Sequence, residues 1–256
     1  MTTPSVAGRM TAARVHTAAA VMDALSELVT PGRADASAWF FKTGPGQYGE
    51  GDQFIGVSVP NQRRVARAFR RVPLAELDWL VDSEVHEHRL TGVLIAVDQY
   101  RAALKRGDNA QQETLVEWYL RAIARGRINN WDIVDSSAPQ ILGDWLFARP
   151  RDLLSQFAHS TDLWQRRIAL LSTLGFIVRG DASSTLELIP LYLDSDQDLL
   201  HKAAGWMLRE VGKRVSRELL RETLEALAGR MPRTMLSYAI EHFSPEERAH
   251  FRALRH

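Results

Sequence analysis

The sequence predicts an all-α protein in which antiparallel pairs of helices stack into a solenoid, an α-α superhelix. Apolar residues recur at intervals of three and four along most of the chain, which is typical of amphipathic helices. Glycine and proline residues interrupt these stretches and indicate short loops. Successive helix pairs start about 35–45 residues apart, which is the period of HEAT-like repeats. A globular bundle of helices fits the same periodicity and stays open as an alternative.

The periodic stretches place helices at residues 15–28, 64–71, 74–81, 89–104, 111–123, 141–147, 163–178, 184–193, 199–211, 217–227 and 234–242. The breakers between them are Pro31-Gly32, Pro60, Gly107-Asp108, Gly126, Pro150, Gly180-Asp181, Gly229 and Ser244-Pro245. Asp23 cuts the first apolar run too short for a signal peptide, and no run approaches the ~20 residues of a membrane span. We therefore expect one domain over residues 1–256, in the cytoplasm and without a membrane partner.

One segment, residues 42–57, is rich in glycine and lacks helical periodicity. It contains the letters G-x-G-x-x-G at Gly44, Gly46 and Gly49. A dinucleotide site needs a strand before this motif and a helix directly after it, and the sequence offers neither. We interpret the segment as a structured loop between two helices, and we expect no cofactor.

Composition excludes some chemistries and leaves others open. The 32 basic and 31 acidic residues give a net charge of +1, so a polyanion site requires local segregation of charge. The chain has no cysteine, which excludes disulfides, thiol nucleophiles and Cys-ligated zinc. His86 and His88 point in different directions on a helix, so we expect no metal there. The pairs Arg63-Arg64 and Arg70-Arg71 are typical of solvated charges, with phosphate contact as an alternative for the first pair.

Trp131 and Asp135 are the first candidate site residues. They lie four residues apart, so on a helix they share one face, and Asp135 borders the apolar stripe. A carboxylate at that border is partly desolvated. The alternative is that Asp135 caps a helix that starts near Pro139, while Trp131 belongs to the core.

The predicted helix 199–211 carries a second group. Lys202, Trp206, Arg209 and Lys213 project toward one side of the helix, away from the apolar side. A tryptophan among cations on such a face indicates a contact surface for a phosphate backbone. The alternative is a solvated basic face with Trp206 covered by a neighbouring repeat. Arg167 falls inside an apolar arc, so it either pairs with a carboxylate or reaches a phosphate.

Four ordered motifs resemble the AlkD family of bacterial DNA alkylation-repair glycosylases, over about residues 39–213. The first consists of FFKTG (40–44), YGEGD (48–52) and FIGV (54–57), followed by Pro60. The second consists of NWDIVDS (130–136) and LGD (142–144). The third is WQRR (164–167), and the fourth is KAAGWMLRE (202–210). The resemblance implies a HEAT-like solenoid with a concave DNA-binding face. It also implies a monofunctional hydrolase that cleaves the N-glycosidic bond of cationic purines, such as N7-alkylguanine and N3-alkyladenine, without a base-flipping pocket, a metal or a cofactor.

By position, Trp131, Asp135 and Trp206 match the catalytic residues of that family, and Arg167 matches an arginine near the phosphates. Phe40, which we also expect to contact DNA, lies where relatives often have tyrosine, so the ring is kept without its hydroxyl. Further expected phosphate contacts are Lys202, Arg209 and Arg63. We expect double-stranded DNA with alkylated bases as the partner, no obligatory protein partner, and a monomer associated with the bacterial nucleoid during repair.

Two other functions remain open. One is a non-catalytic repeat protein that binds damaged or distorted DNA, which Asp135 disfavours because a carboxylate near phosphates only weakens simple binding. The other is a scaffold for proteins, which the lysines beside Trp206 disfavour because protein interfaces are depleted in lysine.

Overall fold

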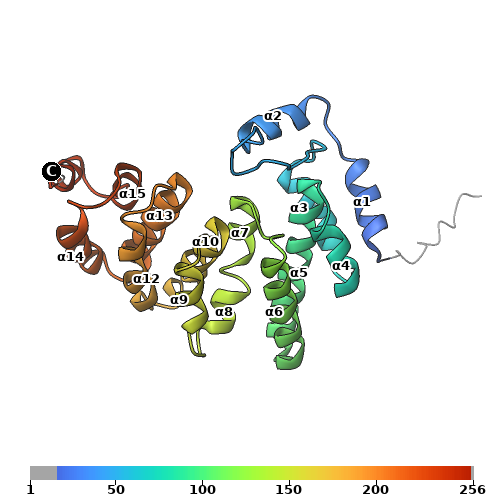
Figure 1. Cartoon of the computed structure of the whole chain (residues 1–256). Helices are drawn as coiled ribbons and strands as arrows, with labels where there is room; N and C mark the ends of the chain where they lie inside the picture. Colours follow the sequence, from blue (N-terminus) through green and yellow to red (C-terminus); the bar gives the residue numbers. More distant parts are fainter. Residues whose placement is uncertain (1–15, 255–256) are drawn as a thin grey trace, which may run out of the picture.

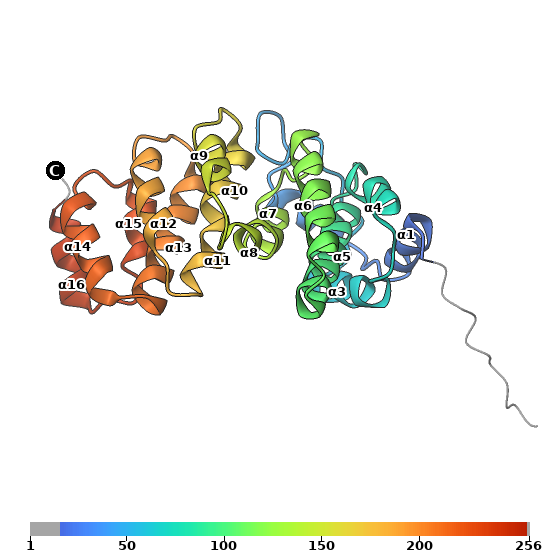
Figure 2. The ribbon, with the colours of Figure 1, turned by 90° about the horizontal axis from the view of Figure 1, so that it is seen from below.

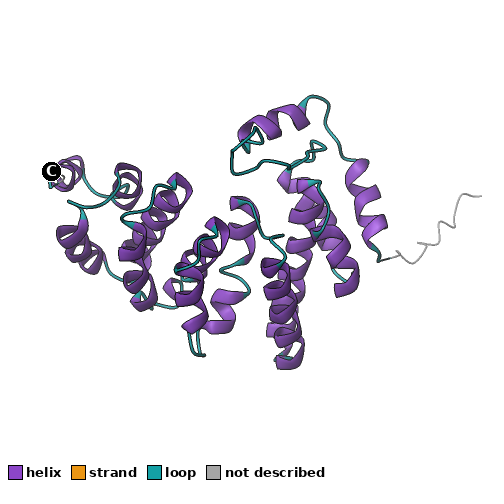
Figure 3. Cartoon of the chain, in the orientation of Figure 1, coloured by secondary structure: helices purple, strands orange, loops and turns teal. Residues whose placement is uncertain are grey.

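The structure is a computed structural model that describes residues 16–254. Within that range it consists of helices and loops, and the only β-type pairing is one isolated bridge between Gln53 and Val85 (Figure 3). The elements are α1 (Ala18–Ser26), α2 (Arg33–Phe40), α3 (Val59–Ala68), α4 (Leu74–Val81), α5 (His86–Arg106), α6 (Asn109–Ala124), α7 (Trp131–Ser137), α8 (Leu142–Leu146), α9 (Asp152–Ala158), α10 (Leu163–Ser172), α11 (Leu174–Ile177), α12 (Ser183–Leu188), the 3₁₀ turn η1 (Ile189–Tyr192), α13 (Asp198–Arg214), α14 (Arg217–Leu227), α15 (Arg233–Ala239) and α16 (Pro245–Ala253).

The helices stack in chain order into an arch, which confirms the predicted helical-repeat solenoid (Figure 1). One row runs through α5, α7, α10, α13 and α15, each of which packs against the next. Helices α6, α9 and α14 pack behind this row, against α5, α10 and α13 respectively. Figure 2 shows the arch from below, with the second row in view. Buried apolar side chains form one continuous cluster from α1 to α16, so the row that carries the candidate site is backed by core along its length.

Most predicted helices are present, with shifted ends. The predicted segments 74–81 and 217–227 coincide with α4 and α14. The segment 163–178 is divided at Thr173 into α10 and α11, and 184–193 divides into α12 and η1. Val15, at the start of the first predicted helix, lies outside the described residues. The sequence pattern missed α2, α9 and α16.

Two prolines that we interpreted as breakers instead lie in the first turn of a helix. Pro60 follows Ser58, whose side chain accepts a hydrogen bond from a backbone amide of α3. Pro245 follows Ser244, which forms a capping box with Glu247 at the start of α16. A proline is tolerated there because its missing amide hydrogen would have no partner within the helix. Among residues 16–254, no helix combines the length and apolar character that a bilayer span needs.

Candidate functional site

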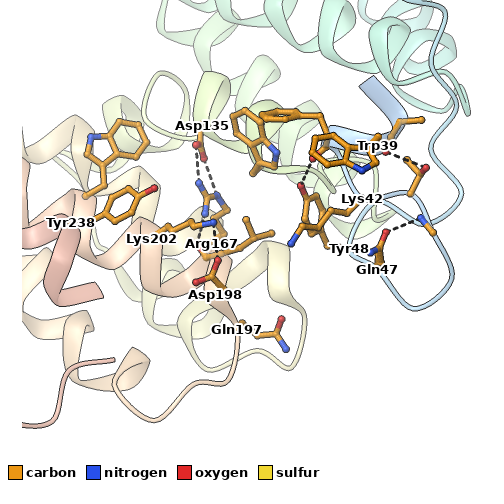
Figure 4. Close-up of a pocket in the computed structure, with 17 residues that line it drawn as sticks. Trp39, Lys42, Gln47, Tyr48, Asp135, Arg167, Gln197, Asp198, Lys202 and Tyr238 are labelled. Atoms are coloured by element: carbon orange, nitrogen blue, oxygen red, sulfur yellow. Dashed lines mark hydrogen bonds and ion pairs between the residues drawn. The ribbon is translucent and has the colours of Figure 1, made fainter. Parts of the chain in front are cut away.

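A cavity of about 1140 Å³ lies between the row of inner helices and the segment around α2. The end of α2 and the loop after it form one wall, α13 and α15 form the opposite wall, and α7 and α10 contribute residues between them. Figure 4 shows Asp135 and Arg167 between these walls, with Tyr238 on one side and Trp39 and Tyr48 on the other. Two segments that are far apart in the sequence therefore face each other across a charged pair.

The charged pair is Asp135 of α7 with Arg167 of α10. Arg167 donates from Nε to Oδ1 of Asp135 at 2.9 Å and from Nη2 to Oδ2 at 2.8 Å. A third donation, from Nη1, goes to the backbone oxygen of Leu199 at 2.5 Å. Burial raises the pKa of Asp135, and Arg167 opposes that rise. The Asp135 carboxylate lines the cavity, and the hydrogen bonds from the buried Arg167 guanidinium fix its position.

This geometry decides between two sequence interpretations. Asp135 does not cap a helix near Pro139, because α7 extends past it and its oxygens bond Arg167. Arg167 is ion-paired with a carboxylate, which was one of the two alternatives for a guanidinium inside an apolar arc. Three N–H donors of Arg167 are already engaged, so the expected contact with a phosphate would have to use the two that remain.

Trp131 is positioned by stacking and by the start of α7. Asn130 is fully buried, and its side-chain oxygen accepts a hydrogen bond from the Trp131 amide at 2.8 Å. The Trp131 ring stacks on Phe41, with ring centroids 5.3 Å apart and planes 12° apart, and meets Phe40 edge to face. Trp131 is thus partly buried but lines the cavity rather than only filling the core.

A buried ionic network lies directly behind Trp131. His86, at the start of α5, reaches Asp132 from Nε2 at 2.9 Å and Asp52 from Nδ1 at 3.2 Å. Arg89 and Asn130 also donate to Asp52, at 2.6 and 2.9 Å. Both ring nitrogens face carboxylates, so both must carry hydrogen. Burial alone lowers the pKa of His86, but Asp132 and Asp52 outweigh it and raise that pKa to about 9.

This network joins the glycine-rich loop to α7. Glu87 adds a second attachment, because its carboxylate accepts hydrogen bonds from the backbone amides of residues 55–57 at 2.8–3.2 Å. Gly49 is required in the loop, since a Cβ there would lie 2.3 Å from the Phe41 carbonyl oxygen. The G-x-G-x-x-G letters therefore belong to a loop that closes tightly on itself between α2 and α3, which agrees with the expected structured loop between two helices although α2 itself was not predicted.

The opposite wall comes from α13 and α15. Gly205 lets these helices approach, because a Cβ there would lie 2.3 Å from the Met235 carbonyl oxygen. The approach brings Tyr238 to the cavity beside Trp206 and Lys202. Lys202 pairs with Asp198 at 2.8 Å, and this hydrogen bond raises the pKa of the lysine. Trp206 also lines the cavity, where it is only partly exposed and its indole nitrogen donates to Glu210.

Six of the expected site residues line the cavity: Phe40, Trp131, Asp135, Arg167, Lys202 and Trp206. Arg209 does not, because it turns to Glu241 and lines a separate cavity of about 380 Å³. Arg63 is exposed on α3 and is absent from the cavity lining. The structure thus divides the predicted cationic stripe of α13 between two cavities.

The sequence interpretation gave no role to four residues that build the site. Trp39, Tyr48 and Tyr238 line the cavity, and His86 fixes the wall behind Trp131. Trp39 is 84% exposed, which is unusual for so large an apolar side chain, and no residue of its helix α2 is buried. Tyr48 was visible only as part of a motif, and Tyr238 had no signal because its contacts depend on how α15 packs.

The chain is similar to proteins of DNA alkylation repair. A family model described as "DNA alkylation repair enzyme" matches residues 21–243. A solved structure described as a "Predicted DNA alkylation repair enzyme from Enterococcus faecalis" superposes with a TM-score of 0.63 at 15% identity, and the match covers 85% of this chain and 97% of that one. At that identity the likeness supports the fold alone. No curated protein matches the chain.

Proposed function

The chain belongs to the family of DNA alkylation repair enzymes, and on that premise we propose that it is a monofunctional DNA glycosylase. Its proposed substrates are cationic alkylated purines in duplex DNA, such as N7-alkylguanine and N3-alkyladenine. The observation that carries the proposal is Asp135, a carboxylate on the surface of an aromatic-walled cavity, held by two hydrogen bonds from Arg167.

The proposed reaction needs little from the enzyme at the base. Alkylation at N7 or N3 leaves the purine positively charged, so it departs as a neutral base without being protonated. The electrons of the N-glycosidic bond go to the base, and the deoxyribose becomes an oxocarbenium-like cation. Water then adds to C1′ and loses a proton to solvent or to a nearby base. The enzyme has to stabilise the charge that forms on the sugar.

Asp135 supplies that stabilisation in our proposal. A carboxylate about 4 Å from a cation, at an effective dielectric constant near 20, contributes about 4 kcal/mol. If the contribution exists only in the transition state, it corresponds to roughly 10³ in rate. Arg167 shares the charge of Asp135, so the net effect is smaller, but it also holds both oxygens in place at no cost during the reaction.

The aromatic walls provide the remaining contacts. Trp131 and Trp206 are placed to pack against deoxyribose and backbone, and their rings attract a cationic base by about 1–2 kcal/mol. We propose Lys202 as a phosphate contact, since it stands at the cavity edge with 42% of its side chain exposed. For Arg167 the geometry favours holding Asp135 over direct phosphate binding.

Release of 7-methylguanine from a methylated duplex tests the proposal, with wild type compared to Asp135→Asn. The amide keeps the shape of the side chain but removes its charge, so release should fall about 10²–10³-fold while duplex binding persists. A uracil-containing duplex serves as the control substrate, because its uncharged base is a poor leaving group. Clear uracil release would contradict the mechanism. Intact binding without any release by wild type would favour a protein that only binds damaged DNA.

A further inference from the structure

A second groove lies at the other end of α5, away from the candidate site. It has a volume of about 1230 Å³ and is formed by the end of α3, the C-terminal half of α5 and the start of α6. Figures 1 and 2 both place the turn between α5 and α6 at the opposite end of these helices from the loop that follows α2. The groove is therefore a separate surface rather than an extension of the cavity around Asp135.

Positive charge gathers in this groove although the whole chain carries a net charge of only +1. One acidic residue, Asp98, stands against six cations in the lining: Arg67, Arg70, Arg71, Arg101, Lys105 and Arg106. Asp98 lies 4.0 Å from Arg101, and Arg106 approaches Asp108 at 3.6 Å. The other four cations have no ion pair with any residue in 16–254. Exposed guanidinium groups in this state are suited to bidentate contacts with phosphate.

The groove has a fixed frame. Gln99 of α5 donates from Nε2 to the backbone oxygens of Arg70 at 3.1 Å and Val72 at 2.7 Å. These bonds hold the turn between α3 and α4 onto α5, so Arg70 and Arg71 are presented from a tethered turn. Lys105 lies in the last turn of α5, beside the same groove. The cations thus come from three elements at a common edge, unlike charges spread along one solvated helix face.

The side chains that line the groove also indicate which kind of nucleic acid would fit it. The cavity around Asp135 carries six aromatic side chains, whereas the groove has none and its apolar lining is aliphatic. Single strands and RNA loops are usually bound by stacking their bases on aromatic rings. A cationic groove without rings suits the backbone of a duplex, which presents phosphates and no exposed base faces.

Distance relates the groove to the candidate site. His86, behind Trp131, and Lys105, in the groove, are 19 residues apart on one helix, which corresponds to about 28 Å at the rise of an α-helix. A duplex covers that length in roughly eight base pairs. We propose that the groove binds the phosphate backbone of the flanking duplex, about eight base pairs from the nucleotide at Asp135. This rests on the proposed function in taking duplex DNA as the substrate.

The test combines duplex length with a triple variant, Arg70→Gln/Arg71→Gln/Lys105→Gln. The probes are undamaged except for one tetrahydrofuran abasic-site analogue that sets the register, and each arm is varied from about 4 to about 14 base pairs to span the expected distance. Binding is measured by fluorescence anisotropy between 50 and 200 mM salt. Three lost phosphate contacts should reduce the slope of log K against log salt by about 2–3, so wild type should lose about 40-fold more affinity than the variant over this range.

The effect should appear only when one particular arm is long. On duplexes in which that arm is short, wild type and variant should have the same slope. A matched control, Arg121→Gln/Arg230→Gln/Arg252→Gln, removes the same charge from exposed positions outside the groove and should behave as wild type on every duplex. Equal losses for the two triple variants, or a loss that does not depend on arm length, would overturn the proposal.

The outcome is separable from that for the proposed function. Single-turnover release of 7-methylguanine from a short duplex should be the same for wild type and the groove variant, because the groove does not touch the reacting nucleotide. If wild type releases no base from any duplex, the glycosylase proposal fails while the length-dependent binding is still measured on the unreactive probes.

Discussion

Arg167 binds both carboxylate oxygens of Asp135 although the two residues are 32 positions apart in the sequence. The pair joins α7 to α10 at the cavity surface, with 5% of the arginine side chain and 17% of the aspartate side chain exposed. A pair this poorly hydrated depends on both partners, since either charge alone would be left in a desolvated position. The chemistry of the site and its local stability are therefore linked through the same two side chains.

Replacing Arg167 with methionine should destabilise the protein by about 3 kcal/mol at pH 7, because Asp135 then remains buried without its cation. The pKa of Asp135, already raised by burial, should rise further without Arg167. Protonation then removes the unpaired charge, so the loss in unfolding free energy should be smaller at pH 5 than at pH 7. Urea denaturation at the two pH values measures this. Arg166→Met, at the adjacent position, is the control and should show no such pH dependence.

Base release should decline on the acidic side through a pKa above 3.8, the ordinary value for aspartate. Burial raises the pKa of Asp135, and the proposed reaction needs its ionised form. The pH–rate profile of 7-methylguanine release, corrected for uncatalysed release, measures this limb. The limb should be absent from the residual activity of Asp135→Asn. A profile that stays flat down to pH 4 would assign the stabilising role to another group.

His86 should stabilise the fold in a defined pH window. Its pKa is raised from 6.5 to about 9 in the folded protein, so the folded state binds the proton more tightly than the unfolded chain. The stabilisation is fully present below pH 6.5 and is lost as the pH rises through 9. The difference in unfolding free energy between wild type and His86→Gln should therefore shrink from pH 6 to pH 9.5. His250→Gln, at the surface, controls for the loss of a histidine as such.

Gly205→Ala should lower both stability and activity. The added methyl would meet the Met235 carbonyl at 2.3 Å and the Cβ of Tyr238 at 2.6 Å, so α15 must move away from α13. Forcing an extra group into a packed interface costs about 1–3 kcal/mol. Gly212→Ala is the matched control in the same helix, because the three atoms nearest to an added Cβ all belong to the Leu220 side chain rather than to backbone. A smaller loss for Gly212→Ala, by thermal denaturation, is the expected result.

The sequence pattern predicted the solenoid because helix periodicity is a local property. It placed Trp131 and Asp135 on one helix face for the same reason, and the structure puts both on the cavity surface. It missed α2 because no side chain of that helix is buried, so no apolar stripe exists to detect. Prolines misled it where a serine cap places them in a first turn, as at Pro60 and Pro245.

The contacts of the site depended on packing that no local pattern encodes. The helical wheel correctly placed Arg167 in an apolar arc, but only the approach of α7 and α10 shows that its partner is Asp135. The pairing of His86 with Asp52 and Asp132 spans 34 and 46 residues and needs the loop to fold back over α5. The same holds for Arg70 and Arg71, which appeared solvated in the sequence and share a groove only because α3 packs on α5.

The exposure of Trp39 allows the cavity to be followed by intrinsic tryptophan fluorescence. Its indole is 84% exposed at the cavity edge, and the only other tryptophan of comparable exposure in residues 16–254 is Trp79, at 71% on α4. In a Trp79→Phe background, emission at the red edge of the spectrum therefore comes mainly from Trp39. Nucleotides that enter the cavity should shift or quench that emission. Occupancy can then be followed in real time without attaching a dye to either the protein or the DNA.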